Sequence, residues 1–190
     1  KALPYPFSTA NELMKQCRKN GLSMEAVIRA NEEVIRSHEV IDDTLDHIWS
    51  VMSMCIDRGL NAKGCLPGPL KVKRRANELY EKLLNSPLKV ADDPLQVIDW
   101  INAYAFAVSE ENAAGGPSVT APTNGAAGVI PAVINYYRQF IPQANKEGIR
   151  TFLLVAGAIG ALYKRTLLFP EQKSAVRAKS AWLVLWQRPD

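Results

Sequence analysis

The chain has 190 residues, of which 47% are hydrophobic and 22% charged, so we expect one globular domain with its own core. Its longest apolar run, residues 152–163, is too short to cross a bilayer, and no signal-peptide pattern opens the chain. The net charge of +4 is small and half of it falls within residues 166–190, so we expect neither a membrane nor a nucleic acid as a partner.

Helical spacing predicts the first elements of the chain. Ser8 or Thr9 could cap a first helix that ends at Gly21, and Ser23 could cap a second helix that runs to about Ser37. A longer helix ending at about residue 59 is predicted from an apolar stripe formed by Ile41, Leu45, Ile48, Trp49, Met52 and Ile56. On this helix we expect His47 to be a half-buried structural residue rather than a catalytic base.

Further helices are predicted around residues 76–84, 97–108, 125–140 and 148–164. Pro131 should kink the third of these. The small residues of 156–161 could serve either tight packing or a binding site. The basic run at residues 71–75 is expected to be a solvated face at a helix start. No segment alternates with the period of a strand, so the sequence predicts an all-α, multi-helix single domain with few or no strands.

The three cysteines offer little for metal binding or for a disulfide framework. Cys17, Cys55 and Cys65 are odd in number and widely spaced, and the chain has only two histidines. We expect free thiols in a reducing compartment and no metal site. Cys65, in a glycine-flanked loop, is the one thiol to test for reactivity.

A polar loop at residues 110–128 is the most informative segment. It contains two carboxylates, several hydroxyl and amide groups, and glycines that let a ligand approach the backbone closely. A loop of this length inside a helical domain is usually functional, a linker or disordered. Pro117 and Pro122 make it too rigid for a simple tether, so we interpret it as the wall of a binding site.

Several motifs together resemble a known family. They read Glu-Glu-Asn-Ala-Ala-Gly-Gly at residues 110–116, Thr-Ala-Pro-Thr-Asn-Gly-Ala at 120–126 and Gly-Ala-Ile-Gly-Ala-Leu-Tyr-Lys at 157–164. Leu-Pro-Gly-Pro-Leu at 66–70 and Val-Ile-Asp-Trp at 97–100 add to them. Over residues 3–165 the chain resembles the α-domain of bacterial iron–sulfur L-serine dehydratases.

The resemblance implies an L-serine ammonia-lyase, which converts L-serine to pyruvate and ammonia by α,β-elimination of water. Such an elimination needs a Lewis acid on the hydroxyl group and a general base at Cα. In this family the Lewis acid is an open iron of a 4Fe–4S cluster held by cysteine thiolates, not pyridoxal phosphate. The resemblance also implies a cytoplasmic enzyme of amino-acid breakdown and gluconeogenesis, with the β-domain of the same enzyme and a homo-oligomer as further partners.

By the same resemblance, four residues of the loop are expected to hydrogen-bond the carboxylate or ammonium of the substrate. They are Thr120, Thr123, Asn124 and Gly125. Asn124 offers both a donor and an acceptor, and Gly125 opens a predicted helix whose N-terminus suits an anion.

Three charged residues carry open alternatives. Glu110 and Glu111 could meet an ammonium group or lie solvated at a helix end. Lys164 could pair with a carboxylate or be an exposed lysine near a helix C-terminus. The sequence assigns no general base.

The resemblance ends abruptly after Arg165. The family is expected to continue Asn-Ala-Ser-Ile-Ser-Gly-Ala-Glu-Val-Gly-Cys-Gln, which supplies the first cluster cysteine, but no cysteine follows Cys65 here. The codons CAG AAG TCG GCT GTC AGG can encode residues 172–177, and from their third letter onward they encode Glu-Val-Gly-Cys-Gln. The same offset works along residues 166–190.

We therefore hypothesise that one nucleotide was lost after codon 165. Residues 1–165 would then be the serine dehydratase α-domain, and residues 166–190 an unstructured or loosely packed out-of-frame tail that favours aggregation. Without the cluster cysteines, this chain should bind no cluster and be inactive. The alternatives are a non-catalytic helical interaction module and a serine-binding remnant.

Overall fold

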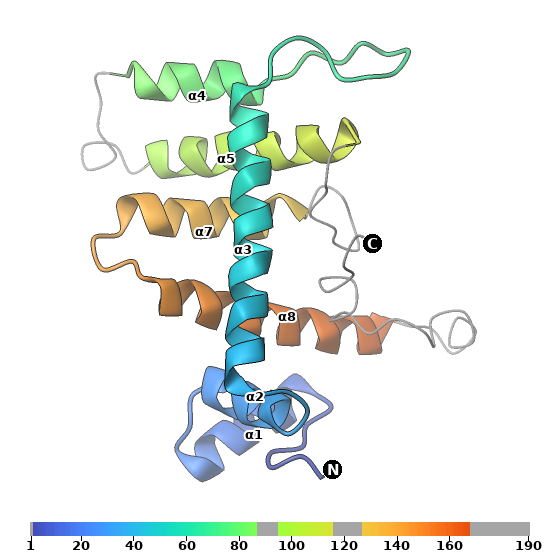
Figure 1. Ribbon diagram of the computed structural model, residues 1–190, viewed down its shortest axis with the longest axis vertical. Coiled ribbons are helices and arrows are strands. Elements are labelled where there is room, and N and C mark those ends of the chain that lie inside the picture. The colour runs from blue at the N-terminus through green and yellow to red at the C-terminus, as the bar shows by residue number, and fades with distance from the viewer. Residues whose placement is uncertain (1, 87–94, 116–126, 168–190) are drawn as a thin grey trace. The chain divides into compact units, whose positions relative to one another are not determined.

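A computed structural model describes residues 2–86, 95–115 and 127–167, and it describes side chains as far as Tyr163. Within these residues the chain forms helices and a single isolated bridge between Cys65 and Lys73, which confirms the all-α prediction (Figure 1). The helices are α1 (Ala10–Asn20), α2 (Met24–Glu33), α3 (His38–Asn61), α4 (Ala76–Leu84), α5 (Gln96–Ala113), α7 (Val129–Phe140) and α8 (Lys146–Leu167). None of the described helices is both long and apolar enough to cross a membrane.

The chain divides into two compact units. Unit 1 combines residues 1–47 with residues 146–190, and unit 2 is the continuous stretch 48–145. Helix α3 contributes its first ten residues to unit 1 and the rest to unit 2.

Unit 1 contains two short capped helices at its N-terminal end. The Thr9 hydroxyl accepts a hydrogen bond from the Glu12 amide at 3.2 Å, and the Ser23 hydroxyl accepts one from the Ala26 amide at 3.1 Å. Gly21 ends α1 with a φ of 63°, in the left-handed conformation that favours glycine. The predicted caps are therefore confirmed, with Thr9 rather than Ser8 at the first position.

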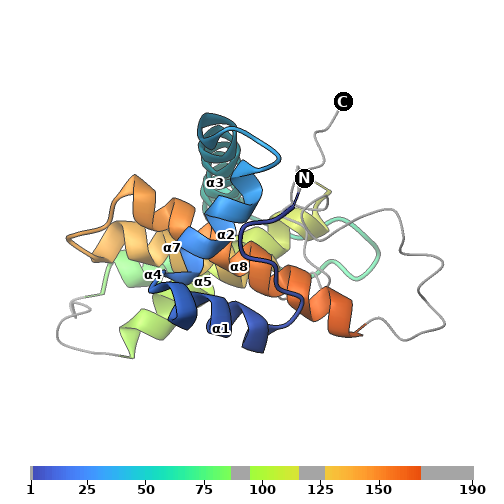
Figure 2. The same ribbon diagram turned by 90° about the horizontal axis from the view of Figure 1, so that it is seen from below.

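Helix α2 ends at Glu33, four residues before the predicted end, and packs against both α1 and α8 (Figure 2). Segments from the two ends of the described chain thus form one core. Its buried side chains include Leu13, Val27, Ile28, Ile41, Leu45, Leu153 and Leu154.

Unit 2 is built around α5, which packs between α4 and α7 (Figure 1). Trp100 of α5 contacts three aromatic rings, with centroid separations of 5.8 Å to Tyr80, 5.9 Å to Tyr104 and 5.1 Å to Phe140. Burial raises the pKa of the Tyr104 hydroxyl, which donates a hydrogen bond of 2.5 Å to Gln139. This aromatic cluster joins the three helices.

Gly59 does not end α3 as predicted; the helix continues to Asn61. A Cβ at this position would lie 2.3 Å from the carbonyl oxygen of Ala107, so the glycine is required where α3 crosses α5 closely. Gly59 therefore allows α3 to pack closely on α5 and does not mark the end of the helix.

The helical backbone is interrupted just before Pro131, because Ala127 is helical and Gly128 is a turn. Helix α7 begins at Val129, so Pro131 occupies its first turn, where backbone amides have no partner within the helix. The predicted start at Gly125 lies outside the described residues. The other predicted helices, around residues 76–84, 97–108 and 148–164, are present as α4, α5 and α8, with small shifts of their ends.

Candidate functional site

Most of the residues predicted to bind the substrate lie outside the residues that the structure describes. Thr120, Thr123, Asn124 and Gly125 lie outside the described residues. The backbone of Lys164 belongs to α8, but its side chain is not described. For these five residues the substrate-binding role stays a prediction.

Glu110 and Glu111 are described, and neither is solvated. They lie in the last turn of α5 and are only 5% and 8% exposed. The alternative of solvated carboxylates at a helix end is therefore wrong, and buried carboxylates must be paired. Their partners show what these residues do in unit 2.

Glu110 caps a neighbouring helix. Its carboxylate accepts hydrogen bonds from the backbone amides of Arg75, at 2.7 Å, and Ala76, at 3.4 Å. Those amides open α4, whose own N-cap residue makes no side-chain capping bond. The negative charge also suits the N-terminal end of the helix dipole. Glu110 thus fixes the start of α4 to the end of α5.

The buried Glu111 forms an ion pair with the half-buried Arg74. Its two oxygens accept hydrogen bonds from Arg74 Nη1 at 3.0 Å and from Arg58 Nε at 3.3 Å. The side chains of Arg74 and Glu111 are each only 10% exposed. Next to this pair, burial raises the pKa of the Cys55 thiol. Both carboxylate oxygens of Glu111 thus already accept a hydrogen bond from a guanidinium group.

The basic run at residues 71–75 is only partly the solvated face that was expected. Lys71 and Lys73 are exposed, as predicted. Arg75 is exposed as well, with its guanidinium over the Phe106 ring, 4.3 Å from the centroid, whereas Arg74 is half-buried and its paired side chain is only 10% exposed. In the sequence, the only sign of these contacts was that two adjacent glutamates, at 110–111, could be matched with two adjacent arginines, at 74–75.

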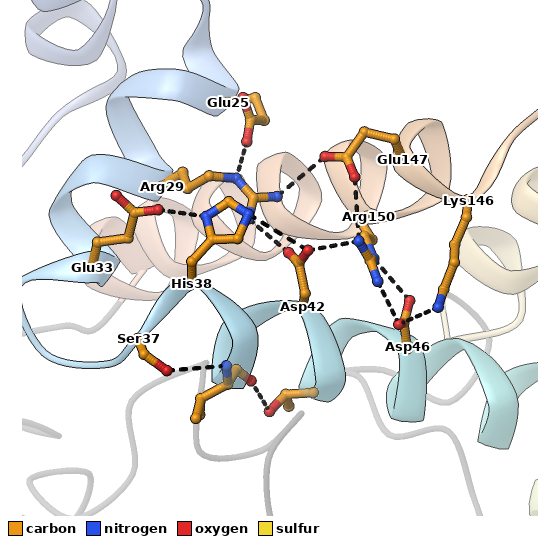
Figure 3. Close-up of polar contacts among 12 residues, drawn as sticks. Glu25, Arg29, Glu33, Ser37, His38, Asp42, Asp46, Lys146, Glu147 and Arg150 are labelled. Carbon is orange, nitrogen blue, oxygen red and sulfur yellow. Dashed lines mark hydrogen bonds and ion pairs between the residues drawn. The ribbon is translucent and has the colours of Figure 1, made fainter.

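A second charged cluster, in unit 1, was not predicted (Figure 3). Arg150 of α8 binds both oxygens of Asp46 on α3, at 2.9 and 2.6 Å, and reaches Asp42 at 2.6 Å. These hydrogen bonds, above all those from Arg150, hold the pKa of Asp46 down to about 2. Lys146 adds a second cation at 2.7 Å from Asp46.

Asp42 links this pairing to α2 (Figure 3). Arg29 donates to Asp42 at 2.7 Å and also pairs with Glu25 and, at 3.4 Å, with Glu147. Burial would raise the pKa of Asp42, but Arg29 and Arg150 outweigh that effect and lower it. The cluster therefore ties α2, α3 and α8 together, and each carboxylate in it already has a cationic partner.

His47 is exposed, so the predicted half-buried structural role is wrong. The stripe that suggested it is real, because Ile41, Leu45, Met52 and Ile56 are all buried. His47 lies off that stripe, two residues beyond Leu45 on a helix with 3.6 residues per turn.

The cysteines of this chain do not form a ligand set for an iron–sulfur cluster. Cys17 and Cys55 are buried, Cys65 is exposed, and all three are free, as predicted. Cys17 belongs to unit 1 and the other two to unit 2. Within the described part of the chain no group of three or more His, Cys, Asp or Glu side chains could hold a metal ion.

Sequence comparisons give a consistent family. The profile of the family described as serine dehydratase alpha chain matches residues 19–169. L-serine dehydratase TdcG of Escherichia coli is 53% identical over 163 residues, which cover 86% of this chain and 36% of TdcG.

Two further relatives agree. L-serine dehydratase 1 of E. coli is 49% identical over 163 residues, covering 86% of this chain and 36% of the relative. The L-serine dehydratase of Streptomyces coelicolor is 50% identical over 162 residues, covering 85% of this chain and 35% of the relative. The chain thus spans about a third of the length of the curated relatives it matches.

Proposed function

Because this chain belongs to the serine dehydratase alpha chain family, we propose that it is part of an L-serine dehydratase, which converts L-serine to pyruvate and ammonia. The family match over residues 19–169 carries this proposal. The complete enzyme would act in the cytoplasm, in amino-acid breakdown and gluconeogenesis. Its β-domain and a second copy of the enzyme are the proposed protein partners.

The substrate would be held by the loop that follows α5. Thr120, Thr123 and Asn124 carry hydrogen-bonding groups suited to the carboxylate and ammonium of L-serine, and Gly125 exposes its backbone to the ligand. Lys164 could pair with the carboxylate. Glu110 would meet the ammonium group of the substrate through the lone pairs that its two capping bonds to α4 leave free.

In the complete enzyme, the iron–sulfur cluster would be held by cysteines that this chain does not contain. A 4Fe–4S cluster would supply the Lewis acid for loss of the hydroxyl group. Since Cys17, Cys55 and Cys65 do not come together as its ligands, we propose that this chain alone binds no cluster and does not deaminate serine. Anaerobic reconstitution with iron and sulfide should produce no visible charge-transfer absorption, and a brown, active product would refute the proposal.

We propose further that residues 166–190 are translated out of frame. The relatives align with 163 of the 190 residues, which leaves a remainder close to the length of this tail. The compatibility of residues 172–177 with the sequence Glu-Val-Gly-Cys-Gln in a neighbouring frame is the second support. Sequencing the gene decides the matter: the proposal requires the neighbouring frame after codon 165 to encode the cysteine-containing family sequence, and a neighbouring frame that does not encode it would exclude the loss of a nucleotide.

A ligand titration separates the remaining alternatives. Thermal unfolding would be followed with L-serine, D-serine and L-threonine. Stabilisation by L-serine alone is expected if the loop still binds substrate. No stabilisation by any of the three would leave the non-catalytic interaction module as the better description of this chain.

A further inference from the structure

The segment between α3 and α4, residues 62–75, forms a projecting arm (Figure 1). Two backbone hydrogen bonds close it into a hairpin, from the Leu66 amide to Val72 at 2.8 Å and from the Arg74 amide to Gly64 at 2.9 Å. At its tip, Gly68 has a φ of 115° and Lys71 a φ of 45°. The arm is thus an ordered excursion rather than a loose connection.

The base of the arm is held to unit 2 by the two carboxylates at the end of α5. Glu110 accepts the backbone amide of Arg75, and Glu111 pairs with the buried guanidinium of Arg74. The Arg75 side chain lies on the Phe106 ring. These contacts fix the direction in which the arm leaves the helices, so little conformational freedom remains to be lost when the arm binds a partner.

The tip of the arm is apolar, and the described residues leave its apolar side chains exposed. Leu70 is 84% exposed, more than any other large hydrophobic side chain described, and Val72 is 48% exposed. Pro67 and Pro69 flank the glycine of the turn and are exposed as well. An apolar group presented on a fixed support is typical of an anchor residue in an interface.

Charge and chain length indicate what the tip contacts. Lys71 is exposed at the tip, so a complementary surface should be acidic at its rim. The chain covers only 36% of the length of TdcG, so roughly two thirds of such an enzyme lies outside the part represented here and can supply that surface.

We propose that residues 62–75 are a docking arm that places Leu70 in an apolar, acid-rimmed groove on the part of the L-serine dehydratase polypeptide that this chain lacks. The proposal rests on the proposed function, since it takes the rest of that enzyme as the occupant. It extends that function by assigning a specific contact between the two parts.

The test compares the 190-residue chain with a complete polypeptide, TdcG in which the 163 aligned residues are replaced by those of this chain. Both would carry Cys65→Ser, so that Leu70→Cys supplies a thiol at the tip while Cys17 and Cys55 remain buried. Labelling is read on the peptide that contains residue 70, because the complete polypeptide has further cysteines. We expect maleimide labelling of Leu70→Cys to be at least about tenfold slower in the complete polypeptide, because the seated tip excludes the reagent. Ile35→Cys, at a 69% exposed position of unit 1, is the matched control and should label at similar rates in both.

Equal labelling of Leu70→Cys in the two proteins would overturn the proposal. Protection in the 190-residue chain that grows with its concentration would overturn it too, because it would identify a second copy as the occupant. A melting experiment is independent of the added thiol. Leu70→Ser should leave the melting temperature of the 190-residue chain unchanged and lower that of the complete polypeptide by about 2–4 °C. Deamination by the complete polypeptide is measured separately. Activity without protection of residue 70 would support the proposed function and contradict the docking arm. Protection without activity would support the docking arm and contradict the proposed function.

Discussion

Glu110 and Glu111 are neighbours of the same type, yet their side chains do different things. One satisfies backbone amides at the start of α4, and the other accepts hydrogen bonds from Arg74 and Arg58. Both fasten residues 74–76 to α5 immediately before the loop that is proposed to bind L-serine. Their motif in the sequence therefore reflects support for the loop at least as much as contact with a ligand.

Removing Glu111 should destabilise unit 2 strongly. Glu111→Ala leaves the buried guanidinium of Arg74 without its carboxylate, which we expect to lower the free energy of unfolding by about 3 kcal/mol. Urea unfolding followed by circular dichroism measures the change. Glu78→Ala, which breaks an exposed pair with Lys73, is the control and should have little effect. Equal losses in the two variants would contradict the buried pairing.

The double variant Arg74→Met/Glu111→Leu gives a second check on the same pair. It removes both charges together, so no buried ion is left without a partner. It should be less destabilised than Glu111→Ala alone. A larger loss would show that the charges themselves, rather than their mutual compensation, stabilise this region.

Asp46 should contribute to the acid sensitivity of unit 1. Arg150 holds its folded-state pKa at about 2, below the ordinary value of 3.8. A lowered folded-state pKa stabilises the fold above the ordinary value, and this stabilisation is lost as the pH falls from about 4 toward 2. Asp46→Asn should therefore weaken the fold at neutral pH and flatten its dependence on pH in that window.

Stability against urea at several pH values would measure this effect. Asp43→Asn, at an exposed position three residues earlier on α3, is the control. It should reproduce the pH profile of the unmodified chain. An unchanged profile for Asp46→Asn would mean that the ion cluster in Figure 3 does not stabilise the fold.

At the scale of the helices, local signals were sufficient where the chemistry is local. Thr9, Gly21 and Ser23 act through hydrogen bonds and backbone conformation within a few residues, and their roles could be predicted. Gly59 acts through a contact with Ala107, 48 residues away, which no local pattern reveals. The same reason explains why the Arg29–Asp42–Arg150 cluster was missed, since its members come from three separate helices.

The two kinds of helical glycine can be told apart by substitution. Gly59→Ala would place a Cβ 2.3 Å from the Ala107 carbonyl oxygen, so we expect a loss of about 2 kcal/mol or more in unfolding free energy. Gly160→Ala meets open space on α8 and should stabilise the helix by up to about 1 kcal/mol. Thermal unfolding of the two variants gives the comparison, and a tolerated Gly59→Ala would show that α3 and α5 are farther apart than described here.

At the scale of the whole molecule, the sequence predicted the helical class and the family, because amphipathic spacing and consecutive motifs are both readable along the chain. The binding role of Thr120, Thr123, Asn124 and Gly125 remains a prediction, because these residues lie outside the described part of the structure. The division into two units was not predicted, since unit 1 joins segments separated by 98 residues (48–145).

Removal of the proposed out-of-frame tail should leave the fold intact. A chain that stops after Leu167 retains all of α8, and residues without a history of selection for packing should add nothing to stability. We expect an unchanged melting temperature and less aggregation on heating, measured by circular dichroism and light scattering. A clear fall in melting temperature on truncation would indicate that the tail is a genuine part of the domain.

The split composition of unit 1 has a consequence for synthesis on the ribosome. Residues 48–145 emerge as one block and can fold while translation continues, whereas α1 and α2 must wait for α8 to complete their core. A slip after codon 165 comes when nearly all of α8 has already been made. If the reading frame does change there, the ribosome has by then made nearly every helical residue that the cores of the two units require.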